Sequence, residues 1–294
     1  MSVHSESPGA RFRALLAQGP IACVGAFDAL SAKVITSIGA RALYVSGFAA
    51  AASAFGEADL GVVTQSEMAE HLRRICRATP LPVIADADTG YGGVLNVERT
   101  VHDWESAGAA GLHLEDQVFP KRCGHLAGKE VITLDEYLSK LRAALSARSD
   151  PSFFIIARTD TLAVHGMDDT LRRCKAFAAA GADAVFVDAP HTVDDLKTIA
   201  SAMRDSGVPL VFNSARTGRS PVLDEGCLAD LGYPIVLYPL EAMLIAQHAV
   251  RENVRAMMHA RTTEQVSDRM LMFNEVNSLV GLQEALKRSS GASN

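Results

Sequence analysis

The chain has 294 residues, of which 48% are hydrophobic and 21% charged, an ordinary balance for a globular protein with a large core. Its net charge of −6 argues against a nucleic-acid-binding surface, and no apolar run reaches the ~18 residues that a membrane span needs. Five cysteines without paired spacing, and an N-terminus without a signal-peptide core, predict a cytoplasmic protein with free thiols.

Eight segments along the chain have the pattern of buried parallel strands. They begin near Ile21, Gly39, Pro82, Gly108, Phe153, Gly181, Pro209 and Gly232. Most of the gaps between them have helical patterns, and four of the strands follow a glycine that ends a helix-like stretch. Eight alternating units predict one (β/α)8 barrel domain over residues 1–294. The alternative is a doubly wound open sheet, but no GxGxxG follows the first strand.

Residues 241–288 have helical patterns and lie beyond the last predicted strand. The stretches "AMLIAQHAV" and "MLMFNEVNSLVGLQEAL" are too apolar to lie free in water. We therefore expect other protein surface to cover these helices.

Polar residues recur where the predicted strands end, and this end of a barrel carries catalytic groups. In chain order they are Asp28, Ser46, Asp86, Asp88, His113, Glu115, Asp116, Arg158, Asp160, Asp188 and Asn213. Each one alone is explained as a cap of the following helix. The set as a whole indicates one functional site.

The segment "ADADTGYGG" contains two carboxylates that are two residues apart. On a strand, the side chains of Asp86 and Asp88 would point to the same face. Close carboxylates repel each other unless a cation is near, and hard oxygen ligands favour Mg²⁺, or Mn²⁺, over Zn²⁺. Mg²⁺ takes one or two protein carboxylates and keeps waters, so Glu115 is expected in its outer shell. The competing interpretation is a simple turn in a glycine-rich loop.

Cys123 lies in "KRCGH", flanked by Lys121, Arg122 and His125. Nearby positive charge lowers the pKa of a thiol, which could then act as an acid or base near neutral pH. The glycines of this loop would let it close over a substrate. The competing interpretation is a small buried hydrophobe, and it suits the other cysteines better: Cys23, Cys76, Cys174 and Cys227.

"KRCGH" with "DADTG" upstream resembles the signature of the isocitrate lyase and phosphoenolpyruvate mutase superfamily, in which this cysteine marks the lyase branch. The resemblance continues through "YVSG", "DLG", "GLHLEDQ", "ARTD" and "LYPL", from near Arg11 to the C-terminal helices. Length and motif order are most similar to the short bacterial branch of 2-methylisocitrate and 2,3-dimethylmalate lyases.

The resemblance implies Mg²⁺-dependent cleavage of a carbon–carbon bond in a small 2-hydroxy di- or tricarboxylic acid. The products would be a 2-oxo acid, pyruvate or glyoxylate, and a second carboxylic acid. It also implies a homotetramer whose C-terminal helices are exchanged between subunits. Three alternatives stay open: oxaloacetate decarboxylation, phosphonopyruvate or phosphoenolpyruvate chemistry, and an inactive barrel that serves in binding or assembly. Cys123 counts against the first two.

The resemblance also implies residue roles. Asp86 would contact the metal directly, and Asp88, Glu115 and Asp59 would contact it directly or through water. Cys123 would protonate the departing acid, with His125 and Lys121 tuning it, and Arg158 would pair with substrate oxygens. Tyr44 is a candidate base because it lies beside Ser46. The residues expected around the substrate are Ser46, Gly47, His113, Gly124, Asp188, Asn213 and Arg216.

Two positions depart from the family pattern. Asp188 stands where the lyases usually have Glu, and Arg216 in "NSARTGRSP" stands where short-branch relatives have an acid. Arg216, together with Arg219, is therefore a candidate to bind an additional carboxylate. The competing interpretation is an arginine that points to solvent.

Overall fold

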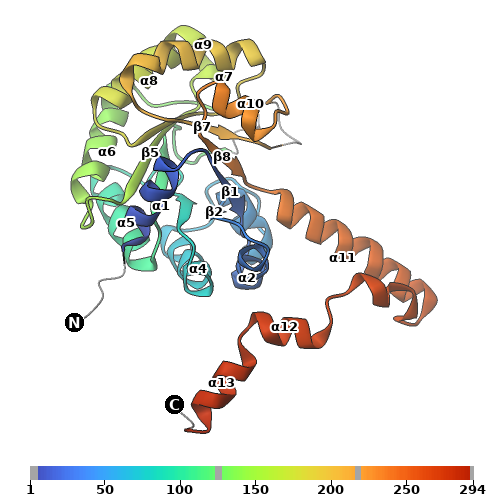
Figure 1. The fold of residues 1–294 in the computed structure, drawn as a ribbon. Helices are drawn as coiled ribbons and strands as arrows, with labels where there is room; N and C mark the ends of the chain where they lie inside the picture. Colours follow the sequence, from blue (N-terminus) through green and yellow to red (C-terminus); the bar gives the residue numbers. More distant parts are fainter. Residues whose placement is uncertain (1–5, 123–127, 216–219, 292–294) are drawn as a thin grey trace.

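The computed structural model describes residues 6–122, 128–215 and 220–291. Eight parallel strands close into a barrel in chain order, with β1 paired to β8 (Figure 1). This confirms the predicted (β/α)8 architecture and excludes the open sheet. The strands are β1 (Ile21–Gly25), β2 (Ala42–Val45), β3 (Val83–Asp86), β4 (Gly111–Glu115), β5 (Phe154–Thr159), β6 (Ala184–Val187), β7 (Leu210–Asn213) and β8 (Ile235–Tyr238).

Helices connect the strands and cover the outside of the barrel (Figure 1). They are α2 (Ala29–Ser37), α3 (Gly47–Ala50), a π-helical turn (Ala51–Phe55), α4 (Gln65–Ala78), α5 (Val94–Ala107), α6 (Leu134–Ala147), α7 (Leu162–His165), α8 (Met167–Ala179), α9 (Val193–Met203), a 3-10 turn (Arg204–Ser206) and α10 (Glu225–Asp230). Gly108 ends α5 with φ +96°, a left-handed conformation in which its N–H caps the carbonyls of Trp104 and Glu105.

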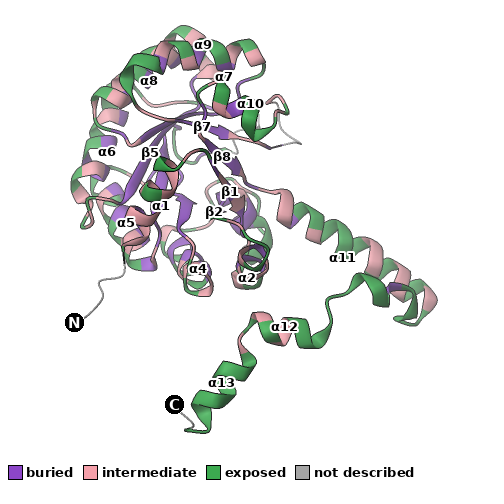
Figure 2. Cartoon of the chain, viewed as in Figure 1, coloured by how far each residue is buried: buried purple, intermediate pink, exposed green. Residues whose placement is uncertain are grey.

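The core has two layers (Figure 2). One fills the barrel interior, and the other lies between the strands and the surrounding helices. Helix α1 (Pro8–Ala17) adds Phe12 to the interior layer, where its ring meets the ring of Phe154 edge-on with centroids 5.0 Å apart. Full burial of a phenylalanine stabilises the fold by roughly 1.5–3 kcal/mol. The end of the barrel opposite the polar strand ends is therefore closed by apolar packing.

The strand register brings the polar strand ends together. Asp86 is the register partner of His113, and Glu115 is the partner of Arg158. Asp28 instead caps α2, because its carboxylate accepts a hydrogen bond from the Ser31 N–H, 2.6 Å away. The helix-cap interpretation is thus correct for Asp28. Cys227 is exposed, so its interpretation as a buried hydrophobe is wrong, whereas Cys23 and Cys174 are buried.

Beyond β8 the chain leaves the barrel as α11 (Glu241–Ala260), followed by a 3-10 turn (Glu264–Arg269), α12 (Phe273–Leu279) and α13 (Leu282–Ser289). Figure 1 shows α11 extending away from the barrel, after which the chain turns back and α12 and α13 lie below the barrel, with α12 near α2. Large apolar side chains on these helices are exposed, including Ile245 (69%), Met258 (71%) and Phe273 (83%). Among the described residues, no helix is both long and apolar enough to cross a membrane.

Candidate active site

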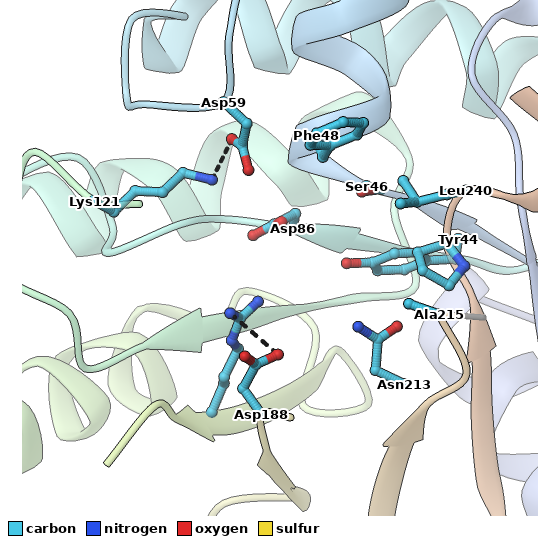
Figure 3. A pocket seen from close by; sticks show the side chains of 12 residues that line it. Tyr44, Ser46, Phe48, Asp59, Asp86, Lys121, Asp188, Asn213, Ala215 and Leu240 are labelled. Carbon is cyan, nitrogen blue, oxygen red and sulfur yellow. Dashed lines mark hydrogen bonds and ion pairs between the residues drawn. The ribbon is translucent and has the colours of Figure 1, made fainter. Parts of the chain in front are cut away.

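A pocket opens at the carboxyl ends of the strands, and polar and charged side chains make up most of its wall. Figure 3 shows Lys121, Asp59 and Asp86 on one side and Asp188 and Asn213 on the other. The pocket encloses about 440 Å³ of space, including its open mouth. Its lining residues are Tyr44, Ser46, Phe48, Asp59, Asp86, Lys121, Arg158, Asp188, Asn213, Ala215, Pro239 and Leu240. Many of the sequence-predicted residues therefore meet in one place.

Asp86, the last residue of β3, is fixed from several directions. Its carboxylate accepts hydrogen bonds from the N–H groups of Gly47 (3.1 Å) and Asp88 (2.9 Å), and its carbonyl accepts one from the indole of Trp104 (3.2 Å). A Cβ on Gly47 would lie 2.9 Å from the Asp86 carboxylate, so a larger residue there would have to displace this carboxylate. Burial raises the pKa of the Asp86 carboxyl, but His113, Lys121 and Arg158 outweigh burial and lower it. Asp86 is a rigidly held carboxylate.

Asp88 reaches the site by a different route from the one that the sequence suggested. Strand β3 ends at Asp86, and Asp88 has φ +46° in the turn that follows. Strand alternation therefore does not explain how the two carboxylates come together, and that part of the prediction is wrong. The turn nevertheless brings the Asp88 carboxylate beside that of Asp86. A Cβ built on Gly47 would lie 2.9 Å from the Asp86 carboxylate and 3.2 Å from the Asp88 carboxylate.

Lys121 supplies positive charge to this acidic side. Its ammonium forms ion pairs with Asp59 and with Asp88, 2.8 Å away, and its side chain is 4% exposed. Burial lowers the pKa of Lys121, but Asp88 and Asp59 outweigh burial and raise it well above its ordinary value. Burial also raises the pKa of Asp88 to about 6. One ammonium thus only partly offsets the crowding of carboxylates.

The residues present fit a hard divalent cation. Glu115 Oε1 is buried and has no hydrogen-bond partner among the described residues, and burial raises the pKa of this carboxyl well above its ordinary value. Asp88 Oδ1 lies near Lys121 without the alignment of a hydrogen bond. In the described part of the chain, however, no three His, Cys, Asp or Glu side chains form a ready-made ligand cluster. This pattern suits an ion that keeps most of its waters, as Mg²⁺ does.

His113 and Tyr44 form a buried pair beside Asp86. The Tyr44 hydroxyl lies 2.7 Å from His113 Nε2, and His113 Nδ1 lies 3.6 Å from Asp86 Oδ1. Burial lowers the pKa of His113 to about 4, so the imidazole is neutral at pH 7. Burial also raises the pKa of Tyr44 well above its ordinary value, which keeps the phenol protonated. With a proton on Nδ1 facing Asp86, Nε2 accepts the hydrogen bond of Tyr44.

Arg158 lies within a group of acids at the pocket. Its guanidinium contacts Glu115 (3.3 Å), Asp160 (3.0 Å) and Asp188 (3.4 Å), and its Cζ lies 5.1 Å from the ring centroid of Phe186. An arginine cannot lose its proton here and presents several donors in a plane. Arg158 is therefore a fixed positive charge at the wall of the pocket.

Two further layers lie behind Arg158, and their cations, Lys129 and Arg173, are absent from the sequence-based list of site residues. Lys129 forms ion pairs with Asp160 (2.7 Å) and Asp188 (3.2 Å), although it is 31 and 59 positions away from them in the chain. Asp116 accepts hydrogen bonds from the Asp160 N–H (2.9 Å) and from Arg173 of α8 (3.0 Å). Strand ends pointed to the acids, but no local pattern marks Lys129.

The remaining predicted residues divide into two groups. Ser46 caps α3 through a long hydrogen bond from the Ala49 N–H (3.4 Å), and Asn213 Oδ1 is buried without a hydrogen-bond partner among the described residues. Cys123, Gly124, His125 and Arg216 lie outside the described residues. Gln117, another residue that the sequence did not single out, holds Arg122 just before them through two hydrogen bonds of 2.9 and 3.0 Å.

Comparison with known proteins gives consistent results. The model of the phosphoenolpyruvate phosphomutase family matches residues 12–258. The 2,3-dimethylmalate lyase of Eubacterium barkeri is 40% identical over 276 residues, covering 94% of both chains. A probable 2-methylisocitrate lyase of Corynebacterium glutamicum is 42% identical over 260 residues, covering 88% of this chain and 84% of the relative.

Solved structures agree with these sequence matches. A crystal structure of 2,3-dimethylmalate lyase superimposes with a TM-score of 0.90 at 34% identity, covering 99% of this chain and 97% of that one. An oxaloacetate acetylhydrolase in complex with 3,3-difluorooxaloacetate also gives 0.90, at 33% identity and 97% coverage of both chains. The fold thus recurs in a 2,3-dimethylmalate lyase and in an oxaloacetate acetylhydrolase.

Proposed function

Because this chain belongs to the phosphoenolpyruvate mutase and isocitrate lyase superfamily, and its named lyase relatives identify it as a lyase, we propose the specific reaction that it catalyses. It cleaves a carbon–carbon bond in a small 2-hydroxy di- or tricarboxylic acid of the 2-methylisocitrate or 2,3-dimethylmalate type. The products are a 2-oxo acid and a second carboxylic acid.

One observation carries this proposal most directly: the pocket has a rigid carboxylate, that of Asp86, and a fixed guanidinium, that of Arg158, in its wall. Both residues line the pocket, and Arg158 pairs with Asp188, which lies across the pocket from Asp86 (Figure 3). Such a pair suits a molecule with a metal-bound, oxygen-rich end and an anionic far end. A small dicarboxylic acid has this shape.

Superfamily members generally depend on a divalent metal, and we propose Mg²⁺, with Mn²⁺ as a substitute, for this chain. Asp86 would hold the ion directly, while Asp88, Glu115 and Asp59 would hold it directly or through waters. When bound, the ion would acidify the substrate hydroxyl and neutralise the oxygens of the oxo-acid end. The buried Glu115 Oε1, which has no hydrogen-bond partner in the described part of the chain, supports this assignment.

The proposed reaction requires the protein to remove the proton of the substrate's 2-hydroxyl group. Tyr44 is a neutral phenol whose hydroxyl faces His113 Nε2 at 2.7 Å. We propose that Tyr44 accepts the hydroxyl proton of the substrate while it passes its own proton to the neutral imidazole. The O–H electron pair then forms the carbonyl of the 2-oxo acid, and the broken carbon–carbon bond leaves its electrons on the departing acid.

The departing acid is a doubly charged enolate, and Arg158 is placed to offset its charge. The resemblance assigns its protonation to the thiol of Cys123, tuned by His125 and Lys121. Gly124 and, with backbone donors, Ser46 and Gly47 complete the proposed contacts with substrate.

A second candidate reaction is cleavage or decarboxylation of oxaloacetate. It is favoured by the similarity to oxaloacetate acetylhydrolase. It needs the same stabilisation of an enolate, but it does not need a thiol acid.

A substrate panel separates these possibilities. 2-Methylisocitrate, 2,3-dimethylmalate, isocitrate, citramalate and oxaloacetate are each incubated with enzyme, with Mg²⁺ or with EDTA, and the pyruvate, glyoxylate and oxalate that form are quantified. We expect Mg²⁺-dependent release of pyruvate or glyoxylate from a hydroxy acid. Release from none of the hydroxy acids would overturn the proposal, and turnover of oxaloacetate alone would establish the second candidate.

Two variants sharpen the result. Cys123→Ser should abolish cleavage of the hydroxy acid but leave oxaloacetate decarboxylation intact. Arg216→Ala tests whether that arginine binds an additional carboxylate, since an unchanged kcat/KM on the true substrate contradicts the idea.

The exposed apolar side chains of α11 and α12 support a proposed homotetramer with exchanged C-terminal helices. Light scattering at micromolar concentration tests this assembly. A single monomer peak would contradict it.

A further inference from the structure

Arg158 belongs to a buried charge cluster whose balance depends on a residue outside the pocket. The cluster consists of Arg158, Lys129, Asp160, Asp188 and Glu115, linked by ion pairs of 2.7–3.4 Å. Arg158 and Asp188 line the pocket, whereas Lys129 and Asp160 are not part of its wall. Lys129 therefore acts from behind the residues that meet a ligand.

Lys129 is held in place by the local backbone. The segments on either side of residues 119–129 pair in antiparallel fashion, with Gln117 bridged to Val131. The Val118 N–H donates to the Glu130 carbonyl (2.8 Å), and the Ile132 N–H donates to the Asp116 carbonyl (2.9 Å). This short stem directs the Lys129 side chain, 2% exposed, into the barrel while its neighbours Gly128 and Glu130 stay exposed.

The positions of the charges indicate what Lys129 does there. Burial lowers the pKa of Lys129, but Asp160 and Asp188 outweigh burial and raise it, so the ammonium stays charged. Burial raises the pKa of Asp160, yet Arg158 and Lys129 together bring it well below its ordinary value, so this carboxylate stays ionised. Without Lys129, Arg158 would be the only cation paired with Asp160 and Asp188 among the members of the cluster.

We propose that Lys129 is a positioning residue: it neutralises Asp160 and Asp188 from behind, so that the positive charge of Arg158 is available to a multiply charged carboxylate ligand. The inference rests on the proposed function, since it assumes that such a ligand occupies the pocket. Lys129 also fixes the aspartates against which the guanidinium is aligned. Its effect on the ligand is electrostatic and passes through Arg158.

Binding of two product-like probes tests this inference. Oxalate carries two negative charges and pyruvate carries one, and both are titrated calorimetrically into wild type and into Lys129→Met in Mg²⁺ buffer. We expect the Kd for oxalate to rise about tenfold or more and the Kd for pyruvate to rise about threefold or less, since charge complementarity weighs most on the dianion. Lys129→Arg should restore oxalate binding to within about threefold of wild type.

A matched control uses a second buried lysine. Lys140 donates its hydrogen bond to the main-chain carbonyl of Thr89 (3.2 Å), so Lys140→Met removes a buried ammonium outside the cluster. Its ratio of oxalate to pyruvate affinity should equal that of wild type. If circular dichroism shows that Lys129→Met does not fold, Lys129→Gln replaces it, because its amide still donates a hydrogen bond but carries no charge. For Lys129→Gln we expect the same selective loss of oxalate binding.

The outcomes separate the two proposals. Equal loss of both probes in the Lys129 variants, or unchanged binding of both, overturns the electrostatic inference while leaving the proposed function intact. A wild-type protein that binds neither probe in Mg²⁺ overturns the proposed function, and the inference falls with it.

Discussion

The buried imidazole of His113 should make the stability of this protein depend on pH in a calculable way. Burial lowers its pKa from 6.5 to about 4. The unfolded chain therefore binds a proton more readily than the folded chain between these two values. The stabilisation is fully present above pH 6.5 and is lost as the pH falls through 4.

The perturbation is His113→Asn, which keeps a hydrogen-bonding amide but removes the titrating group. From the two pKa values, the free energy of unfolding of wild type minus that of the variant should fall by about 2 kcal/mol between pH 7.5 and pH 5. The constant cost of the substitution cancels, because only the change with pH is compared. Asp86 and the other acids titrate in both proteins.

Urea denaturation followed by circular dichroism gives both free energies, with EDTA present so that no divalent ion alters the charge beside Asp86. Histidine NMR of the folded protein gives the pKa directly. A pH-independent difference between the two proteins, or an imidazole that titrates near 6.5, would refute the reasoning from burial.

Two further predictions test the packing around the pocket. Gly47→Ala places a methyl carbon 2.9 Å from the Asp86 carboxylate, so kcat/KM should fall about 100-fold while the circular dichroism spectrum stays unchanged. A kcat/KM within about threefold of wild type would contradict this steric argument. Arg173→Met breaks a buried ion pair with Asp116 and should lower the free energy of unfolding by about 3–5 kcal/mol, whereas Arg172→Met, on the exposed side of the same helix, should cost less than about 1 kcal/mol. Equal losses in the two arginine variants would show that burial does not decide the effect.

The barrel could be predicted from the sequence because each of its units has a local signature. A short apolar run marks each strand, and a glycine marks the end of several helices, as at Gly108. The polar ends of the strands then identified most of the pocket, since parallel strands bring their carboxyl ends to one face.

What the sequence did not reveal depends on contacts between distant residues or on irregular backbone. Lys129 pairs with acids on two other strand ends, and such pairings leave no periodic trace. Strand alternation predicts that Asp88 points to the same face as Asp86, but the positive φ of Asp88 belongs to a turn, which alternation rules do not describe. Asp28 is of the same residue type as Asp86, and only the tertiary structure distinguishes the helix cap from the pocket carboxylate.

The hydrogen bond between Trp104 and the carbonyl of Asp86 also gives the protein an internal optical probe. Trp104 is the single tryptophan of the chain, and its indole is fully buried. Its emission therefore comes from one position, directly behind the carboxylate at the centre of the pocket. Any event that shifts the end of β3 should change that emission, so occupancy of the pocket can be followed in the unlabelled, unmodified enzyme.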